Sequence, residues 1–157
     1  EGRRRATDVI RKHRLAERLL LDVVGMDRRL VHEEACRWEH VMSEQVEERL
    51  AAILDDVSVD PFGNPIPPRA AEHPSPSTDE VSVDRLAGRE TVAAVVSRIG
   101  EPIQADAELI TTLEDAAITA GAHVELRVSA GGVRLVGPSG DPVVLADDIA
   151  RHLFVRR

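Results

Sequence analysis

The chain has 157 residues, enough for one or two small domains, and its hydrophobic fraction of 43% excludes a chain that is disordered throughout. Acidic residues outnumber basic ones by 28 to 20, and the net charge of -8 argues against a broad surface that grips a phosphate backbone. The single cysteine excludes an internal disulfide, and no apolar run approaches the ~20 residues of a membrane-spanning helix. With no secretory signal at its start, we expect a protein of the cytoplasm.

The first third of the chain has the apolar spacing of amphipathic helices. The first helix is predicted to run from Thr7, as its N-cap, to about Val24, followed by Gly25 as a left-handed C-cap. Its apolar side is formed by Ile10, Leu15, Leu19, Leu20 and Val23. The arginines of this helix could attract DNA, but we expect them to be solvated, as charged residues on a helix face usually are.

Two further helices are predicted in the same block. The second follows Asp27 and ends near Val41, and Ser43 has the side chain of a helix N-cap for the third. The third helix is expected to bury a stripe formed by Val46, Leu50, Ile53 and Leu54.

A segment rich in Pro, Ser and Gly then separates two domains. We predict a helical domain over residues 1–66, a linker over 67–80 and a second domain over 81–157. Phe62 and Ile66 are apolar, so this part of the chain is expected to lie against the helical block.

The last part of the chain has the pattern of short strands with glycine turns. One helix is predicted over residues 106–117, and the strands over residues 81–86, 91–99, 123–129, 133–136, 143–145 and 152–155. Short strands at this spacing predict a small barrel or an open sheet.

Metal-ligating side chains are concentrated on the first two helices. His13 and Glu17 stand four residues apart, the separation at which two side chains of one helix face can share a cation. On the second helix, the thiol, carboxylate and imidazole of Cys36, Glu39 and His40 span an arc of roughly 100°. His32 projects from the same face one turn earlier. Spacing alone leaves open whether these residues form one crowded site or two adjacent sites.

A hydrolytic site is a weaker interpretation of the same residues. His32 and Glu33 begin a near-match to the H-E-x-x-H zinc motif, in which the glutamate is a general base. Here the second histidine is replaced by Cys36, and no third ligand follows. A thiolate would lower the Lewis acidity of the metal, which disfavours hydrolysis.

Three ordered segments resemble the iron-dependent repressors of the diphtheria toxin repressor family. They are Arg11–Leu20, Val31–Ser43 and Pro61–Pro67. The resemblance implies an α+β protein with a helical metal-binding and dimerisation domain, followed by a small barrel that resembles a Src-homology-3 domain. In that family a winged helix-turn-helix contacts operator DNA, and it has no counterpart in this sequence. We therefore expect this chain not to bind the operator without such a domain.

The resemblance assigns the ligands to two sites. Cys36, Glu39 and His40 match the primary, activating site, and His13, Glu17 and His32 match the ancillary site. The family completes the ancillary site from the barrel, where Asp106 and Leu109 stand at the matching positions. Of these only Asp106 can coordinate a metal; Glu108 and Gln104 are the alternatives if the register is shifted.

The resemblance also implies the ion and the partners. Fe(II) is expected in the cell, and Co(II), Ni(II), Zn(II) or Mn(II) could substitute, because thiolate, carboxylate and imidazole suit divalent ions of intermediate softness. A repressor of two-fold DNA must be a dimer. We assign the contact between copies to Trp38, Val46 and Leu50. The alternatives are a manganese-type sensor, which the thiol disfavours, a metallohydrolase, and a structural metal module that does not act on DNA.

Overall fold

The structure is a computed structural model that describes residues 2–69, 79–86, 90–129 and 131–157. The chain divides into two compact units, residues 1–75 and 76–157. Most of the predicted linker, residues 70–78, lies outside the described residues. None of the described helices is long and apolar enough to cross a membrane.

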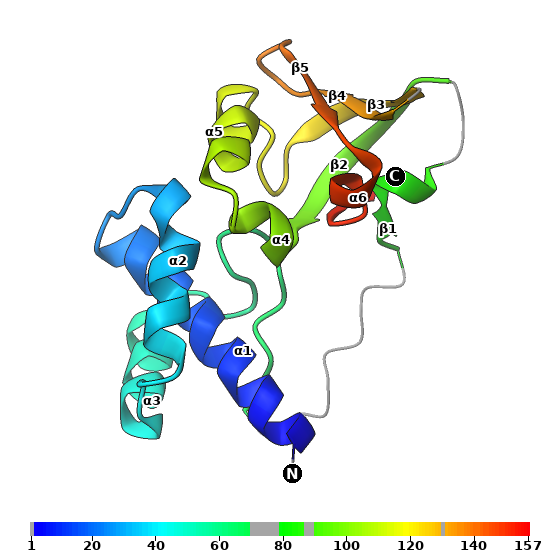
Figure 1. The fold of residues 1–157 in the computed structure, drawn as a ribbon. Helices are drawn as coiled ribbons and strands as arrows, with labels where there is room; N and C mark the ends of the chain where they lie inside the picture. The colour runs from blue at the N-terminus through cyan, green and yellow to red at the C-terminus, as the bar shows by residue number, and fades with distance from the viewer. Residues whose placement is uncertain (1, 70–78, 87–89, 130) are drawn as a thin grey trace. The chain divides into compact units, whose positions relative to one another are not determined.

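The first unit is helical, as the spacing predicts. Its described elements are α1 (Gly2–Arg18), the π-helical turn η1 (Leu19–Val23), α2 (Arg28–Glu39) and α3 (Glu44–Ile53). Both α2 and α3 pack against α1 (Figure 1).

The helix ends follow local side-chain chemistry. Asp27 caps α2 by accepting a hydrogen bond from the Arg29 amide, and Ser43 caps α3 by accepting one from the Val46 amide at 3.3 Å. The predicted cap at Thr7 is wrong, because α1 is already helical from Gly2 and Thr7 is buried in its interior. Gly25 follows the last helical turn with a φ of 72°, a left-handed conformation that suits glycine.

The core of this unit is aliphatic and includes the segment after α3. Leu15, Leu54 and Ile66 pack together, and Phe62 is buried, so the expectation for Phe62 and Ile66 is confirmed. The stripe predicted on α3 is buried only in part, since Val46 and Ile53 are 49% and 60% exposed in the single chain.

The second unit is a six-stranded antiparallel sheet in the order β1-β6-β2-β3-β4-β5. Its strands are β1 (Val81–Ser82), β2 (Val92–Ile99), β3 (His123–Ser129), β4 (Gly132–Val136), β5 (Pro142–Leu145) and β6 (Leu153–Arg156). The predicted strand over 81–86 is a strand only in its first two residues, because Val83–Arg85 form the 3₁₀ turn η2. The sheet is open rather than a closed barrel, and the α+β class is confirmed.

Short helices connect the strands. They are α4 (Glu101–Gln104), α5 (Ala107–Asp115) and α6 (Asp147–Ala150). The predicted helix over 106–117 corresponds to α5, and Asp106 is its N-cap. The four-residue helices α4 and α6 were not predicted, because a single turn has no amphipathic period to detect.

Candidate metal centre

The predicted ligands of the helical unit meet where α2 packs on α1. His13 and Glu17 lie one turn apart on α1, and their exposed fractions are 4% and 0%. His32, Cys36 and Glu39 lie on α2 at intervals of four and three residues, which places them on one helix face. The structure therefore brings five of the seven predicted metal ligands to one seam.

Three donor atoms form a compact triangle within this seam. His13 Nε2 lies 2.9 Å from Glu17 Oε1 and 3.1 Å from His32 Nδ1. The third side, from His32 Nδ1 to Glu17 Oε1, is 3.2 Å. Two ligand atoms at ~2.1 Å from one ion and at right angles to each other would be separated by about 3.0 Å. The triangle thus has the dimensions of three ligand atoms on one face of an ion.

The burial of Glu17 supports the same fit. Its second carboxylate oxygen, Oε2, is buried and has no hydrogen-bond partner among the described residues. A buried carboxylate oxygen without a partner is costly unless a cation or a donor satisfies it. Two imidazoles and a carboxylate suit divalent transition metals.

The ionisation of Glu17 is set by two opposing effects. Burial by itself raises the pKa of this carboxyl, but hydrogen bonds and charge interactions with His13 and His32 lower it more. The pKa of Glu17 therefore lies below its ordinary value of 4.5, so the side chain is an anionic ligand at neutral pH.

Cys36 and Glu39 contact the ring nitrogens of the two histidines that lie outside the triangle. Cys36 is close to His32, and Glu39 is close to His13. Cys36 Sγ lies 3.7 Å from His32 Nε2, and Glu39 Oε2 lies 2.7 Å from His13 Nδ1. One ligand atom from each of His13, His32 and Cys36 lies within 4.8 Å of the other two. Glu17 and Cys36 consequently stand on opposite edges of His32, as expected if they belong to different ions.

His40 stands apart from this cluster. It is the C-cap of α2 and its side chain is 70% exposed, although Nε2 lies 3.1 Å from Glu39 Oε1. One residue beyond Glu39 is a rotation of about 100°, which turns His40 away from the seam. Its assignment to a site with Cys36 and Glu39 stays a prediction.

The candidate ligands of the second unit make hydrogen bonds within it, although Gln104 Oε1 is buried and has no hydrogen-bond partner among the described residues. Asp106 Oδ1 accepts hydrogen bonds from the amides of Glu108 and Leu109, at 3.1 and 3.0 Å. Gln104 is buried, and its Nε2 donates to the Ile99 carbonyl at 2.6 Å. The role of Asp106 as a ligand stays a prediction.

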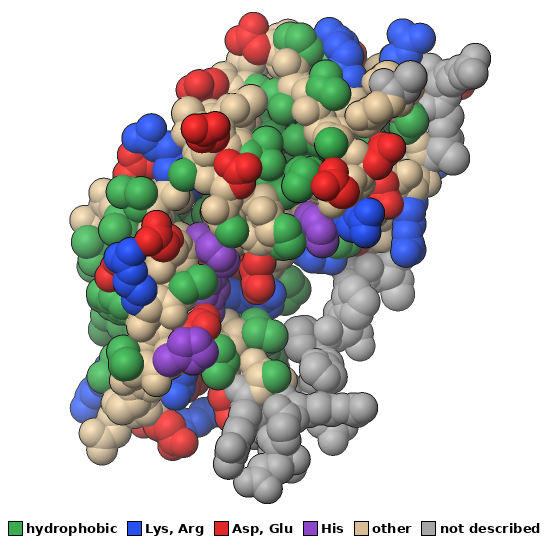
Figure 2. Space-filling view, in the orientation of Figure 1, with side chains coloured by type: hydrophobic (Ala, Val, Ile, Leu, Met, Phe, Trp, Pro, Cys, Tyr) green, Lys and Arg blue, Asp and Glu red, His purple; other side chains and the backbone are tan. Residues whose placement is uncertain are grey.

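The residues assigned to the dimer contact differ in exposure. Val46 is 49% exposed, Trp38 is half-buried and donates to Glu34 Oε1 at 2.7 Å, and Leu50 is only 7% exposed. The burial of Leu50 places it in the core of one chain and disfavours a contact with another copy. Figure 2 shows apolar side chains exposed among charged ones on the helical unit. The exposed large apolar side chains of this unit include Val23, Val24, Leu30, Val41, Val46 and Ile53.

Two arginines of α1 bind the backbone of a segment that is distant in the sequence. Arg11 Nη1 donates to the Pro67 carbonyl at 2.7 Å, and Arg14 Nη1 donates to the Pro65 carbonyl. The side chains are only 12% and 15% exposed, so the prediction that they are solvated is wrong for these two. No sequence spacing signals a bond to a carbonyl more than 50 residues away.

Asp60, in the segment that these arginines contact, is a second buried carboxylate. It is 3% exposed, and its Oδ2 lies 3.6 Å from Arg14 Nε. Burial and the negative charge of Glu17 raise the pKa of Asp60 to about 7, against hydrogen bonds from Asn64 that lower it.

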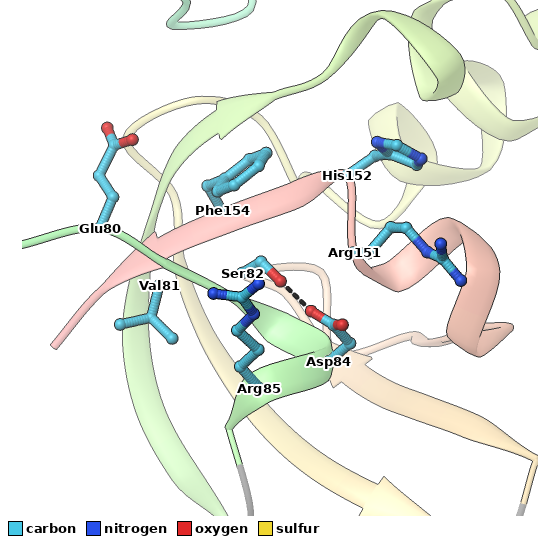
Figure 3. A pocket seen from close by; sticks show the side chains of 8 residues that line it. All are labelled: Glu80, Val81, Ser82, Asp84, Arg85, Arg151, His152 and Phe154. Atoms are coloured by element: carbon cyan, nitrogen blue, oxygen red, sulfur yellow. Dashed lines mark hydrogen bonds between the residues drawn. The ribbon is translucent and has the colours of Figure 1, made fainter. Parts of the chain in front are cut away.

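A cavity of about 570 Å³ lies in the second unit, and none of the predicted site residues lines it. Figure 3 shows Asp84 between Arg85 and Arg151 among the side chains that line this cavity. Its wall includes the Phe154 ring, over which Arg98 stacks at 3.4 Å from the ring centroid, and Glu80, which accepts from Arg98 Nε at 2.8 Å.

Two family models match the chain. Residues 1–68 match the model described as the iron dependent repressor metal binding and dimerisation domain. Residues 81–157 match the diphtheria toxin repressor SH3 domain.

Named relatives match over nearly the whole chain. It is 44% identical over 163 residues to the iron-dependent repressor IdeR of Mycobacterium tuberculosis, an alignment that covers 100% of this chain and 71% of that protein. It is 44% identical over 166 residues to the diphtheria toxin repressor of Corynebacterium diphtheriae, covering 98% of this chain and 69% of the relative.

The solved structures that superpose on this chain are also named as metal-dependent repressors or as IdeR. A manganese-dependent transcriptional repressor in complex with manganese superposes with a TM-score of 0.79 at 29% identity, over 98% of this chain and 71% of that one. IdeR of T. acidophilum superposes with a TM-score of 0.76 at 29% identity, over 99% of this chain and 68% of that one.

Proposed function

The chain belongs to the diphtheria toxin repressor family of iron-dependent repressors, and we propose that its helical unit senses a divalent metal ion between α1 and α2. The observation that carries this proposal is the triangle of donor atoms from His13, Glu17 and His32, with sides of 2.9–3.2 Å. Two of these donors come from α1 and one from α2, so an ion there would join the two helices.

The protein's own residues explain how binding would be transmitted. His13 and Glu17 are held on one helix face and are almost fully buried, so few rotamers must be fixed when an ion binds. The ion would supply positive charge to a seam that holds buried carboxylates. A ligand that binds one arrangement of α1 and α2 better than another shifts the population toward it, and this is how concentration becomes a regulatory signal.

We propose Fe(II) as the ion in the cell and Co(II), Ni(II), Zn(II) or Mn(II) as substitutes. The relatives include proteins named for iron and solved structures named for manganese. Affinity alone favours the later metals, so cellular availability must help to select iron. The thiol of Cys36, at the opposite edge of His32, favours iron over a manganese-type sensor.

We propose that the chain regulates transcription and has no enzymatic activity. A metallohydrolase would need Glu33 or Glu34 beside the ion as a general base. Instead both side chains pair with Arg37, on the outer face of α2, and Glu33 is 69% exposed.

The proposed partners are a second copy of the chain and, for the full repressor in the cytoplasm, operator DNA. The dimer contact is assigned to Trp38 and Val46 together with the other exposed apolar side chains of the helical unit. The net charge of -8 disfavours direct contact between these two units and DNA, which we assign to a winged-helix domain of the full repressor.

The metal proposal is tested by titrating Co(II) into the wild-type chain, His13→Ala and the control His123→Ala. His123 is an exposed histidine on β3 in the other unit. We expect His13→Ala to weaken Co(II) binding by at least about tenfold and the control to change it less than twofold. Equal affinities of all three proteins would refute the site.

A further inference from the structure

The loop of residues 58–67 is held by arginines from both helices that carry the proposed ligands. On α1, Arg11 and Arg14 lie on either side of His13 in the sequence and donate to the carbonyls of Pro67 and Pro65. Arg28, the first residue of α2, donates to the Pro61 carbonyl at 2.8 Å. The loop therefore spans the seam in which the donor triangle lies.

Asp60 holds the loop together through hydrogen bonds to other residues of the loop. Its Oδ1 accepts hydrogen bonds from the amides of Phe62 and Asn64, at 2.8 and 2.9 Å. Its Oδ2 accepts one from Asn64 Nδ2 at 3.0 Å and faces Arg14 Nε at 3.6 Å. Oδ1 thus holds the backbone of the loop, and Oδ2 binds a side chain of the loop and lies close to Arg14 of α1.

Asp60 also interacts with the metal centre through charge. The negative charge of Glu17 acts on Asp60, and Arg14 precedes Glu17 by three residues on the same side of α1. Two buried carboxylates near each other repel, and either a cation or a proton on one of them relieves the repulsion. Arg14 supplies one positive charge for this pair, and an ion at the triangle would supply the remainder.

We propose that Asp60 is a positioning residue of the metal centre, which with Arg14 fixes the 58–67 loop against α1 and α2 so that loop closure and ion binding stabilise each other. The inference rests on the proposed metal site. Because such coupling is reciprocal, an ion must tighten the loop as much as the loop strengthens binding of the ion.

The first test compares Asp60→Asn with the control Asp56→Asn. Asparagine keeps the oxygen that accepts from the Phe62 and Asn64 amides, but it replaces the anionic Oδ2, which faces Arg14 and accepts from Asn64 Nδ2, with an amide nitrogen. Asp56 is an exposed aspartate just before the loop, whose Oδ1 accepts from the Ser58 amide at 2.7 Å. We expect the Co(II) dissociation constant to rise about tenfold for Asp60→Asn and to stay within twofold for Asp56→Asn.

The second test needs no variant. Amide hydrogen exchange of the wild-type chain is followed with and without Co(II), at Phe62, Asn64 and Ile66, whose N–H groups are bonded within the loop. Exchange at these amides is expected to slow on binding, whereas exchange in β3 stays constant.

The outcomes separate the two proposals. Wild-type protein that fails to bind Co(II) overturns the metal centre and this inference with it. Wild-type protein that binds Co(II) with unchanged loop exchange overturns the inference alone. A folded Asp60→Asn protein with wild-type affinity does the same.

Discussion

The pKa values of two buried carboxylates in the helical unit are shifted in opposite directions because their neighbours differ. Glu17 is hydrogen-bonded to two histidines, which hold its pKa below the ordinary value despite burial. Asp60 is buried close to that negative charge, and its pKa rises to about 7 although Asn64 and Arg14 act against the rise. The same degree of burial thus leaves one side chain anionic and the other able to hold a proton near neutral pH.

Asp60 gives the metal-free protein a pH dependence of defined sign. Between its ordinary pKa of 3.8 and about 7, the folded state binds more protons than the unfolded state, so the free energy of unfolding must fall as pH rises. The shift corresponds to a fall on the order of 2–4 kcal/mol across that range. Urea unfolding from pH 4 to 8, in the presence of a chelator, measures it.

Asp60→Asn is expected to flatten this part of the pH profile, because the asparagine side chain does not titrate. Asp56→Asn is the control, since Asp56 is exposed and the Ser58 hydrogen bonds lower its pKa. A decline in stability that survives in Asp60→Asn would assign it to another group.

At the residue scale, the sequence reveals candidate ligands better than it reveals the residues that are proposed to position them. His13 and Glu17 are recognisable because four-residue spacing on a helix is sufficient to bring two donors together. Asp60 is not, since an aspartate in a segment rich in proline and glycine is typical of any turn. His40 belongs to the same predicted arc, but its side chain is 70% exposed, so its role as a ligand stays a prediction.

At the scale of elements, α3 presents an apolar face that one chain does not cover. Val46 and Ile53 are two turns apart on α3 and are 49% and 60% exposed, whereas Leu50 between them is buried. Residues that belong to a dimer contact have this combination of apolar character and exposure in the isolated chain.

We expect Val46→Glu to weaken dimerisation by at least about tenfold, because a carboxylate would be buried without a partner in the contact. Sedimentation velocity over a range of concentrations measures the dimer dissociation constant. Val144→Glu is the matched control, since Val144 is 61% exposed on β5 in the other unit. An unchanged dimer in Val46→Glu would exclude α3 from the contact.

Elements were predictable where their period was long enough. The predicted strand over residues 123–129 coincides with β3, and the cap at Ser43 is confirmed, because alternation and capping are local signals. The strand predicted over residues 81–86 ends at Ser82. The turn of Val83–Arg85 depends on packing, which the alternation of apolar and polar residues in the sequence does not reveal. The helical period predicts which residues form the apolar face of α3. It does not predict whether the same chain or a second copy covers that face.

At the scale of the whole molecule, the described metal donors that come together all belong to one unit. His13, Glu17, His32, Cys36 and Glu39 are in the helical unit, whereas Asp106 is in the sheet unit. Trp38, the single tryptophan of the chain, lies on α2 among these ligands. Its fluorescence therefore reports on the unit that is proposed to bind the ion.

Metal is expected to stabilise the two units unequally. Zn(II) at one hundred times its dissociation constant should raise the free energy of unfolding reported by Trp38 fluorescence by about 2.7 kcal/mol, because it binds the folded seam and not the unfolded chain. Amide exchange at Val124 and Leu126, in β3, should stay constant. If the unfolding transition reported by Trp38 does not change, the site is contradicted. If amide exchange in β3 slows as much as the Trp38 transition predicts, the placement of the site in one unit is contradicted.

Slower exchange confined to the first turn of α5 would instead support the predicted role of Asp106 as an additional ligand.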